Sequence, residues 1–166
     1  LIDNMFETMY GAHGVGLAAP QIGLPIRLFI VDGSPFAEDD EDGPGDQSLK
    51  DFKKVFINPI IVEESGDKWA FSEGCLSIPD IQEEVMRHSN VVINYLDENF
   101  VEHEIELSGL AARIVQHEYD HIEGKLFTDK LPVLKKTMLK AKLDAISKGL
   151  VRVAYKMKFP FQKKGR

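Results

Sequence analysis

Residues 116–121, QHEYDH, constrain this chain more than any other part of its sequence. His117 and His121 are four residues apart, so a helix places both imidazoles on one face, one turn apart. Two imidazoles at this spacing can bind one metal ion, and Glu118 between them can act as a base beside it. The alternative is a solvated helix with two surface histidines. The apolar run GLAARIV before the motif instead favours a helix that is buried on one side.

Residues 108–124 contain signals for both ends of such a helix. Ser108 is a suitable N-cap, and Gly124 stands where a helix-ending residue is expected. Apolar residues recur between them at helical intervals, at Leu110, Ala111, Ile114, Val115 and Ile122. The sequence therefore predicts that the two histidines lie in the last turns of an amphipathic helix.

A catalytic site of this kind usually has three protein ligands, so a third is needed. Cys75, the only cysteine, lies in the segment EGCLSIP and is the leading candidate. Glu123 and Asp129 are alternatives further along the chain. One sulfur and two imidazoles suit Zn²⁺, Fe²⁺, Co²⁺ and Ni²⁺ alike, so the ligand types do not select the metal.

The rest of the chain predicts strands followed by helices. The expected elements are helices at 1–10 and from 132 to about 149, strands at 27–31, at 52–63 and within 150–166, and a hairpin at 90–107. Pro59 is expected to break the second strand, and the acidic residues 33–50 are expected to form an exposed loop. This order predicts an α+β fold with antiparallel or mixed sheets around the metal-binding helix, followed by a C-terminal helix.

Length and charge add three expectations. The 166 residues, 43% of them hydrophobic, suit one catalytic domain spanning 1–166, although the opening residues read like the inside of a helix and suggest missing residues upstream. No apolar run is long enough to cross a bilayer. Residues 135–166 carry 11 basic side chains and 1 acidic one, against a net charge of −7 for the whole chain. This basic C-terminal helix and tail either binds a polyanion or is a solvated surface.

Three segments, GVGLAAPQ at 14–21, EGCLSIP at 73–79 and QHEYDH at 116–121, resemble one family, the peptide deformylases. They follow the order of the family, and the resemblance extends over about residues 2–131. It implies a metallo-amidohydrolase that removes the formyl group from the N-terminal formylmethionine of newly made polypeptides and releases formate. The rival interpretations are a zinc-dependent endopeptidase of the HExxH type and a metal-binding module without catalysis.

The resemblance also implies a role for each matching residue. The metal ligands would be Cys75, His117 and His121, and the metal would be one divalent ion, Fe²⁺ in cells, with Zn²⁺, Ni²⁺ or Co²⁺ possible. Glu118 would be the general acid/base. The side-chain amide of Gln21 and the backbone N–H of Leu76 would form the oxyanion hole.

Substrate recognition is expected from the main chain of Gly16, with the peptide lying alongside as an extra strand. The methionine side chain of the substrate is expected to enter an apolar pocket. The candidates for lining this pocket or its surroundings are Gly74, Phe71, Leu110, Arg113 and Ile114. Gln82 departs from the family, which often has an arginine at that position. The implied partners are nascent formylmethionyl peptides and, through the basic tail, the ribosome, with no DNA or membrane partner. The expected location is the bacterial cytoplasm rather than an organelle.

Overall fold

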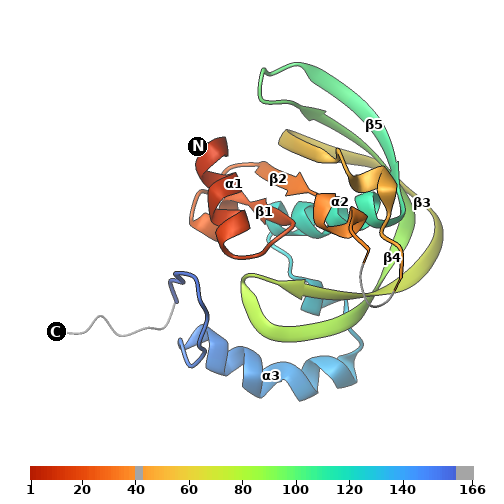
Figure 1. Cartoon of the computed structure of the whole chain (residues 1–166). Helices are drawn as coiled ribbons and strands as arrows, with labels where there is room; N and C mark the ends of the chain where they lie inside the picture. Colours follow the sequence, from red (N-terminus) through yellow and green to blue (C-terminus); the bar gives the residue numbers. More distant parts are fainter. Residues whose placement is uncertain (40–42, 160–166) are drawn as a thin grey trace. The chain divides into compact units, whose positions relative to one another are not determined.

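The computed structural model describes residues 1–39 and 43–159, which form three α-helices and a five-stranded sheet (Figure 1). The helices are α1 (Ile2–Gly11), α2 (Gly109–Ile122) and α3 (Val133–Ser147). The strands are β1 (Gly16–Ala18), β2 (Leu28–Asp32), β3 (Lys53–Cys75), β4 (Ile78–Leu96) and β5 (Glu102–Ser108). Short 3₁₀ helices occur at η1 (Ala19–Ile22), η2 (Ser34–Ala37), η3 (Gln47–Leu49) and η4 (Phe127–Lys130).

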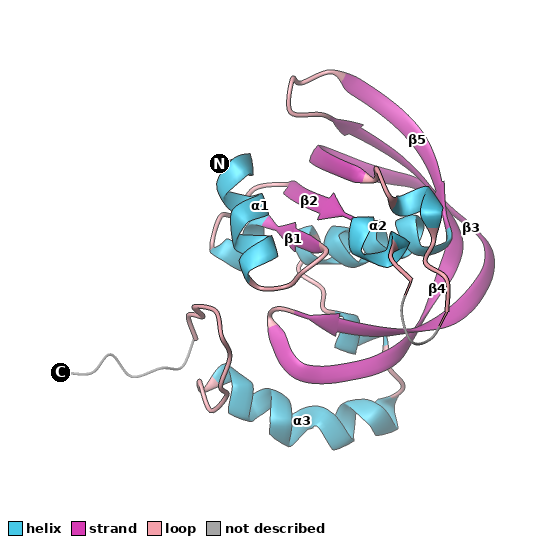
Figure 2. Ribbon diagram, in the orientation of Figure 1, coloured by secondary structure: helices cyan, strands magenta, loops and turns pink. Residues whose placement is uncertain are grey.

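The strands are arranged in their order along the chain, from β1 to β5. β1 pairs with β2, β2 with β3 and β4 with β5, in each case antiparallel. The long ribbons of β3 and β4 dominate the sheet in Figure 2. Antiparallel strands with helices outside the sheet confirm the predicted α+β class.

The chain divides into two compact units. The first comprises residues 1–69 and 87–126, and the second comprises residues 70–86 and the described residues from 127 onward. Strands β3 and β4 contribute residues to both units. No helix in the described part of the chain is long and apolar enough to cross a membrane.

The core of the first unit is built on aromatic residues from three strands. Phe56 of β3 lies between Phe29 of β2 and Tyr95 of β4, with ring centroids 4.7 Å and 4.4 Å apart. α2 packs on β1, β2 and β5, and its residues Ile114 and Val115 belong to the same apolar cluster. Burying a side chain of this size stabilises a fold by about 1.5–3 kcal/mol, so this cluster holds α2 against the sheet.

The amphipathic pattern at the start of the chain forms α1 as predicted. Met5, Phe6 and Met9 face inward and are buried, at intervals of one, three and four residues. The predicted hairpin is confirmed as well, with Leu96 of β4 opposite Glu102 of β5.

The predicted break at Pro59 is wrong, because β3 continues from Lys53 through to Cys75. Asn58 adopts a φ of 49°, in the left-handed region, and its N–H donates to the carbonyl of Arg27. Arg27 in turn donates from Nη2 to the Pro59 carbonyl at 3.0 Å. The side chain of Arg27 therefore satisfies the carbonyl of Pro59, the residue whose missing N–H predicts the break.

Residues 33–50 are less loop-like than their composition predicts. They contain η2 and η3, and Ala37 and Leu49 are buried against the core of the first unit. Residues 40–42, in the middle of the acidic run, lie outside the described residues. The prediction of an exposed loop is therefore wrong for the two 3₁₀ helices.

In the second unit, α3 begins after Pro132 and ends at Ser147, close to the predicted bounds. The apolar residues of α3 are buried only in part: Ile146 is buried, whereas Leu134 and Met138 are exposed. The strand predicted for the end of the chain does not form in residues 150–159, and residues 160–166 lie outside the described residues.

Candidate active site

The helix that carries the HExxH motif is α2, and both of its ends are where the sequence predicts them. It begins directly after Ser108, although the Ser108 side chain makes no capping hydrogen bond, and it ends before Gly124, which has a φ of 70°. A left-handed residue at this position is a common helix terminator, and glycine adopts it without strain.

The two histidines of the motif lie together on one face of α2. Their ring centroids are 5.1 Å apart, and the rings are nearly perpendicular. His121 is buried, and burial, reinforced by electrostatic interactions with His117 and Arg87, lowers its pKa from 6.5 to about 3. Neutral imidazole is the form that binds metal ions, so His121 is in its ligand form at neutral pH.

Glu118, between the histidines, is buried against the first strand of the sheet. Its side chain lies so close to Gly16 of β1 that a Cβ on this glycine would be 2.6 Å from the Glu118 carboxyl carbon. Only glycine leaves room for the carboxylate at this position. β1 is also the terminal strand of the described sheet. The candidate base therefore lies directly beside a sheet edge.

Gln21 is held in a defined orientation by its own backbone. It lies in η1, and its Oε1 atom accepts a hydrogen bond of 2.8 Å from the N–H of Ala18. The bond uses the acceptor end of the amide and directs the donor end, Nε2, the other way. An amide fixed in this manner is suited to donate to a substrate oxygen.

A buried polar network that the sequence did not predict holds α2 to β4. Arg87 Nη1 lies 2.6 Å from Asp120 Oδ2, and its side chain is almost fully buried. Gln116 donates from Nε2 to the carbonyl of His88 at 3.0 Å and to that of Ala112 at 3.1 Å. Asp120 and Gln116 belong to the same motif as the histidines, so this network orients the face that carries them.

Cys75 is the last residue of β3, in the second unit, and Leu76 and Ser77 follow it as a turn before β4. The Ser77 N–H donates to Cys75 Sγ at 3.4 Å. Among the described residues, one group of possible metal ligands is found: Cys75, His117 and His121. Neither Glu123 nor Asp129, the alternative third ligands, belongs to it, and Glu123 is paired with Arg27 at 2.7 Å. A sulfur and two imidazole nitrogens fit a transition metal of borderline softness.

The other candidates for substrate binding lie in different surroundings. Arg113 of α2 is buried, with its guanidinium 4.5 Å above the Trp69 ring and Nη2 2.7 Å from the Trp69 carbonyl. Ile114 belongs to the apolar core of the first unit, and Leu110 packs against that core. Phe71 and Gly74 lie in β3, where they belong to the second unit. A role in substrate binding stays a prediction for these five residues.

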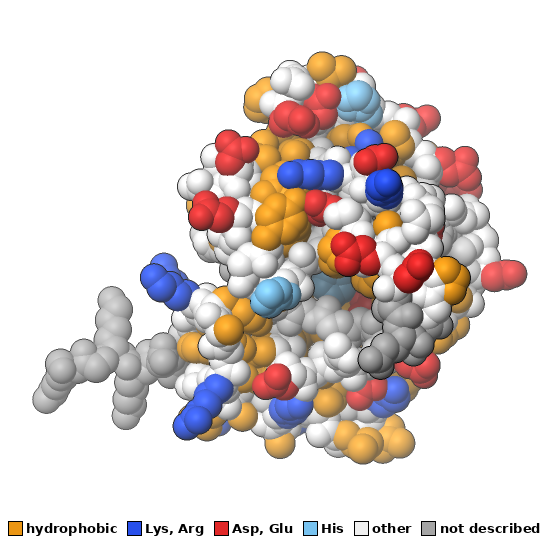
Figure 3. Space-filling model, viewed as in Figure 1, with side chains coloured by type: hydrophobic (Ala, Val, Ile, Leu, Met, Phe, Trp, Pro, Cys, Tyr) orange, Lys and Arg blue, Asp and Glu red, His pale blue; other side chains and the backbone are white. Residues whose placement is uncertain are grey.

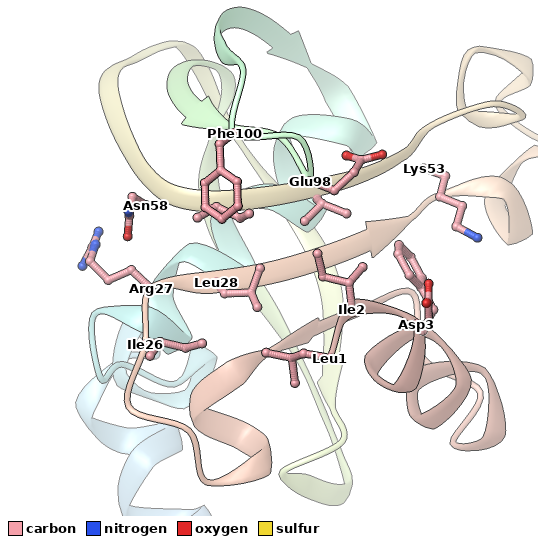
Figure 4. Close-up of a pocket in the computed structure, with 13 residues that line it drawn as sticks. Leu1, Ile2, Asp3, Ile26, Arg27, Leu28, Lys53, Asn58, Glu98 and Phe100 are labelled. Atoms are coloured by element: carbon pink, nitrogen blue, oxygen red, sulfur yellow. The ribbon is translucent and has the colours of Figure 1, made fainter.

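A separate pocket of about 690 Å³ lies in the first unit and contains none of the predicted site residues (Figure 4). Its walls combine apolar side chains such as Leu28 and Phe100 with the charged groups of Arg27, Lys53 and Glu98. The predicted metal ligands and catalytic residues therefore lie outside this pocket. The molecular surface in view in Figure 3 likewise carries charged side chains of both signs among hydrophobic ones.

Two histidines and a buried glutamate on one helix, with a thiol as a possible third ligand, define the class of metal-dependent hydrolases. The polypeptide deformylase family matches residues 1–137. The chain is 60% identical over 167 residues to a peptide deformylase of Christiangramia forsetii, an alignment that covers 100% of this chain and 85% of the relative. It is 47% identical over 155 residues to the peptide deformylase of Salinibacter ruber, covering 93% and 78% of the two chains.

Solved structures agree with these relatives. A peptide deformylase from Legionella pneumophila has a TM-score of 0.71 and 42% identity, covering 91% of this chain and 81% of that one. An Arabidopsis thaliana peptide deformylase bound to an inhibitor has a TM-score of 0.75 and 38% identity, covering 90% and 76%. The chain belongs to the peptide deformylase family. It is thus an amidohydrolase that removes the formyl group of newly made polypeptides, and the endopeptidase alternative is not favoured.

Proposed function

We propose that Glu118 is the general acid/base of the deformylation reaction and that Cys75, His117 and His121 hold the metal. The observation that carries this assignment is the burial of Glu118 against Gly16, at the edge strand to which a peptide backbone could add. When bound, the metal supplies Lewis acidity, which lowers the pKa of a coordinated water from about 15.7 to about 7.

In this scheme, side-chain and backbone groups of the protein transfer the proton and stabilise the negative charge that develops on the substrate. Glu118 accepts the proton of the attacking water and delivers it to the departing amine nitrogen. The Gln21 amide and the Leu76 N–H donate to the formyl oxygen as it becomes negative. The bond from Ala18 to Gln21 Oε1 supports the role of Gln21, because it holds the side-chain amide in one orientation.

The substrate backbone is placed beside β1 in this proposal. Gly16 then offers main-chain groups to the peptide, while the methionine side chain enters a pocket for which Phe71, Gly74, Leu110, Arg113 and Ile114 are the candidates. The buried guanidinium of Arg113, stacked on Trp69, supports a position in the wall of such a pocket rather than in solvent.

The decisive experiment is anaerobic formate release from formyl-Met-Ala-Ser by the iron-loaded enzyme, compared with Glu118→Ala. We expect the variant to retain its metal and to lose about two to four orders of magnitude in kcat, the usual contribution of a general base. A variant with its metal in place and an unchanged rate would refute the role of Glu118. The absence of formate from the metal-replete wild-type protein would refute the reaction itself.

The resident metal is proposed to be Fe²⁺. The donor set of one thiolate and two imidazoles also accepts Zn²⁺, Ni²⁺ and Co²⁺, so the proposal rests on the likeness to the family. Thiolate beside ferrous iron is prone to oxidation, which favours a reducing cytoplasm as the place of action. Metal analysis after anaerobic purification should find iron, with activity that declines in air. A zinc protein of undiminished activity in air would contradict this assignment.

The basic C-terminal region is proposed to contact the ribosome, from which formylated chains emerge. Lys136 and Lys148 of this region are exposed, and such side chains can bind RNA phosphates. Replacing both by glutamate should weaken co-sedimentation with ribosomes at low salt and leave formate release unchanged. Unaltered co-sedimentation would exclude these two lysines as ribosome contacts.

A further inference from the structure

The turn that joins β3 to β4 is short and directly follows Cys75. β3 ends at Cys75 and β4 begins at Ile78, so the turn consists of Leu76 and Ser77. Two-residue hairpin turns prefer types I′ and II′, which require a positive φ at one or both central residues. Among the described residues, the non-glycine positions with positive φ are His13, Asn58, Asp80 and Phe100. Leu76 and Ser77 are not among them, so the turn is neither type I′ nor type II′.

The segment that follows α3 contacts this turn. Tyr155 donates a hydrogen bond of 2.8 Å from its hydroxyl to the carbonyl of Leu76, 79 positions earlier in the chain. The phenol is partly buried, and its burial, followed by the charges of Cys75 and Asp80, raises its pKa. Tyr155 is thus protonated at neutral pH and remains a donor.

The acceptor of this bond belongs to a peptide group that is held at both ends. The Leu76 carbonyl and the Ser77 N–H are parts of the same planar unit. The carbonyl accepts from Tyr155, and the N–H on the opposite side donates to Cys75 Sγ at 3.4 Å. A rotation of this plane would break both hydrogen bonds together, and it would change the backbone ψ of Leu76, whose N–H belongs to the adjoining peptide.

Two side chains of α3 also contact the first residues of β4, in the same unit. Lys142 donates from Nζ to the carbonyl of Asp80, and Lys135 Nζ lies 2.5 Å from Glu83 Oε2. As the chain proceeds from Lys135 to Tyr155, its partners run backward from Glu83 to Leu76. The C-terminal region therefore follows the start of β4 in the antiparallel sense and ends at the turn.

We infer that Tyr155 is a positioning residue for catalysis, which fixes the Leu76–Ser77 peptide plane and thereby orients the Leu76 N–H and the Cys75 sulfur. The inference rests on the proposed roles of Cys75 and Leu76. Tyr155 acts through the turn and does not touch the substrate. The match to the family model ends at residue 137, before Tyr155, and neither composition nor periodicity singles this tyrosine out.

The test is Tyr155→Phe, which keeps the ring and removes only the hydroxyl. The matched control is Tyr10→Phe, which removes a tyrosine hydroxyl bonded to Asp32 in the first unit. We expect kcat for formate release to fall about three- to tenfold in Tyr155→Phe with KM changed less than twofold, because one neutral hydrogen bond is worth about that factor. The control should retain the wild-type kcat.

Amide hydrogen exchange, followed by NMR on the zinc-loaded protein, gives a readout that is independent of activity. The Ser77 amide should exchange about two- to tenfold faster in Tyr155→Phe, while the Val115 amide in α2 keeps its wild-type rate. Faster exchange at both amides would indicate a general loss of stability and would overturn the inference. A wild-type kcat together with unchanged Ser77 exchange would overturn it as well. If wild-type protein releases no formate, the proposed function fails, whereas the exchange at Ser77 still tests the turn.

Discussion

Arg87 Nη1 lies 2.6 Å from Asp120 Oδ2, and this ion pair joins β4 to the helix that carries the two histidines. Asp120 follows Glu118 by two residues and precedes His121 directly, so the pair fixes the rotation of α2 about its axis. An ion pair of this kind is costly to break, because removing one partner takes the opposite charge away from a group that stays buried.

The variant Asp120→Ala should therefore lower the free energy of unfolding by about 3–5 kcal/mol. Asp144→Ala is a matched control, because Asp144 pairs with Lys140 at 2.9 Å on the exposed surface of α3. Exposed pairs contribute about 0–1 kcal/mol. Urea unfolding measures the free energy of unfolding of both variants. An equal decrease in the two would show that burial does not strengthen the ion pair between Arg87 and Asp120.

Gly16→Ala tests the close approach of β1 to Glu118. The added methyl group would overlap the Glu118 side chain, so we expect kcat/KM to fall at least about tenfold, with a loss of stability of about 1–3 kcal/mol. Gly11→Ala is the control, since a Cβ there meets nothing within 4 Å. Normal deformylation by Gly16→Ala would mean that Glu118 can move aside without losing its function.

Arg113→Lys tests the contact with Trp69, the only tryptophan of the chain. Lysine keeps the charge and loses the planar stacking and the 2.7 Å bond from Nη2 to the Trp69 carbonyl. Intrinsic fluorescence should change, and stability should fall by about 1–3 kcal/mol. Arg152→Lys, in the exposed tail, should alter neither quantity. An unchanged emission spectrum of Arg113→Lys would argue against the stacked geometry.

The bond of 2.5 Å from Tyr10 to Asp32 predicts how stability depends on pH. Burial and the bond to Asp32 raise the pKa of Tyr10, so its contribution to stability is complete below pH about 10 and is lost as the pH rises through the raised value. Burial opposes ionisation of Asp32, but hydrogen bonds from Ser34 and Tyr10 outweigh it and lower the pKa. The contribution of Asp32 is therefore present above pH about 4 and is lost as the pH falls through the lowered value.

Tyr10→Phe should reduce both effects. Its stability should depend less on pH above 10 than that of the wild type, and it should lose less stability on acidification below pH 4. Urea unfolding at a series of pH values measures both limbs. Parallel profiles for the two proteins would show that the Tyr10 bond does not control these titrations.

The parts of the fold that the sequence predicts well are those set by local signals. The ends of α2 follow from Ser108 and Gly124, and the turn of the last hairpin follows from Asp97, whose carboxylate accepts from the N–H groups of Asn99 and Val101. Spacing alone places His117 and His121 on one helical face, because four residues make about one turn.

The remaining features depend on partners far away in the sequence. Arg87 and Asp120 are 33 positions apart, and nothing near either residue identifies the other. The full length of β3 is hidden for a related reason, since Pro59 reads as a strand breaker until the Arg27 side chain is seen to support its carbonyl. Each of these contacts exists only after the sheet has assembled, so periodicity and propensity cannot reveal it.

The shortness of β1 limits how many substrate residues the enzyme can bind along this strand. The strand has three residues, and at about 3.3 Å per residue its edge is about 10 Å long. If a peptide adds to this edge as proposed, only its first few residues are held, and they are held mainly through main-chain groups that all polypeptides share. An enzyme that holds its substrate through so few main-chain hydrogen bonds would process new proteins of unrelated sequence alike. It could act as soon as a short stretch of each chain is exposed.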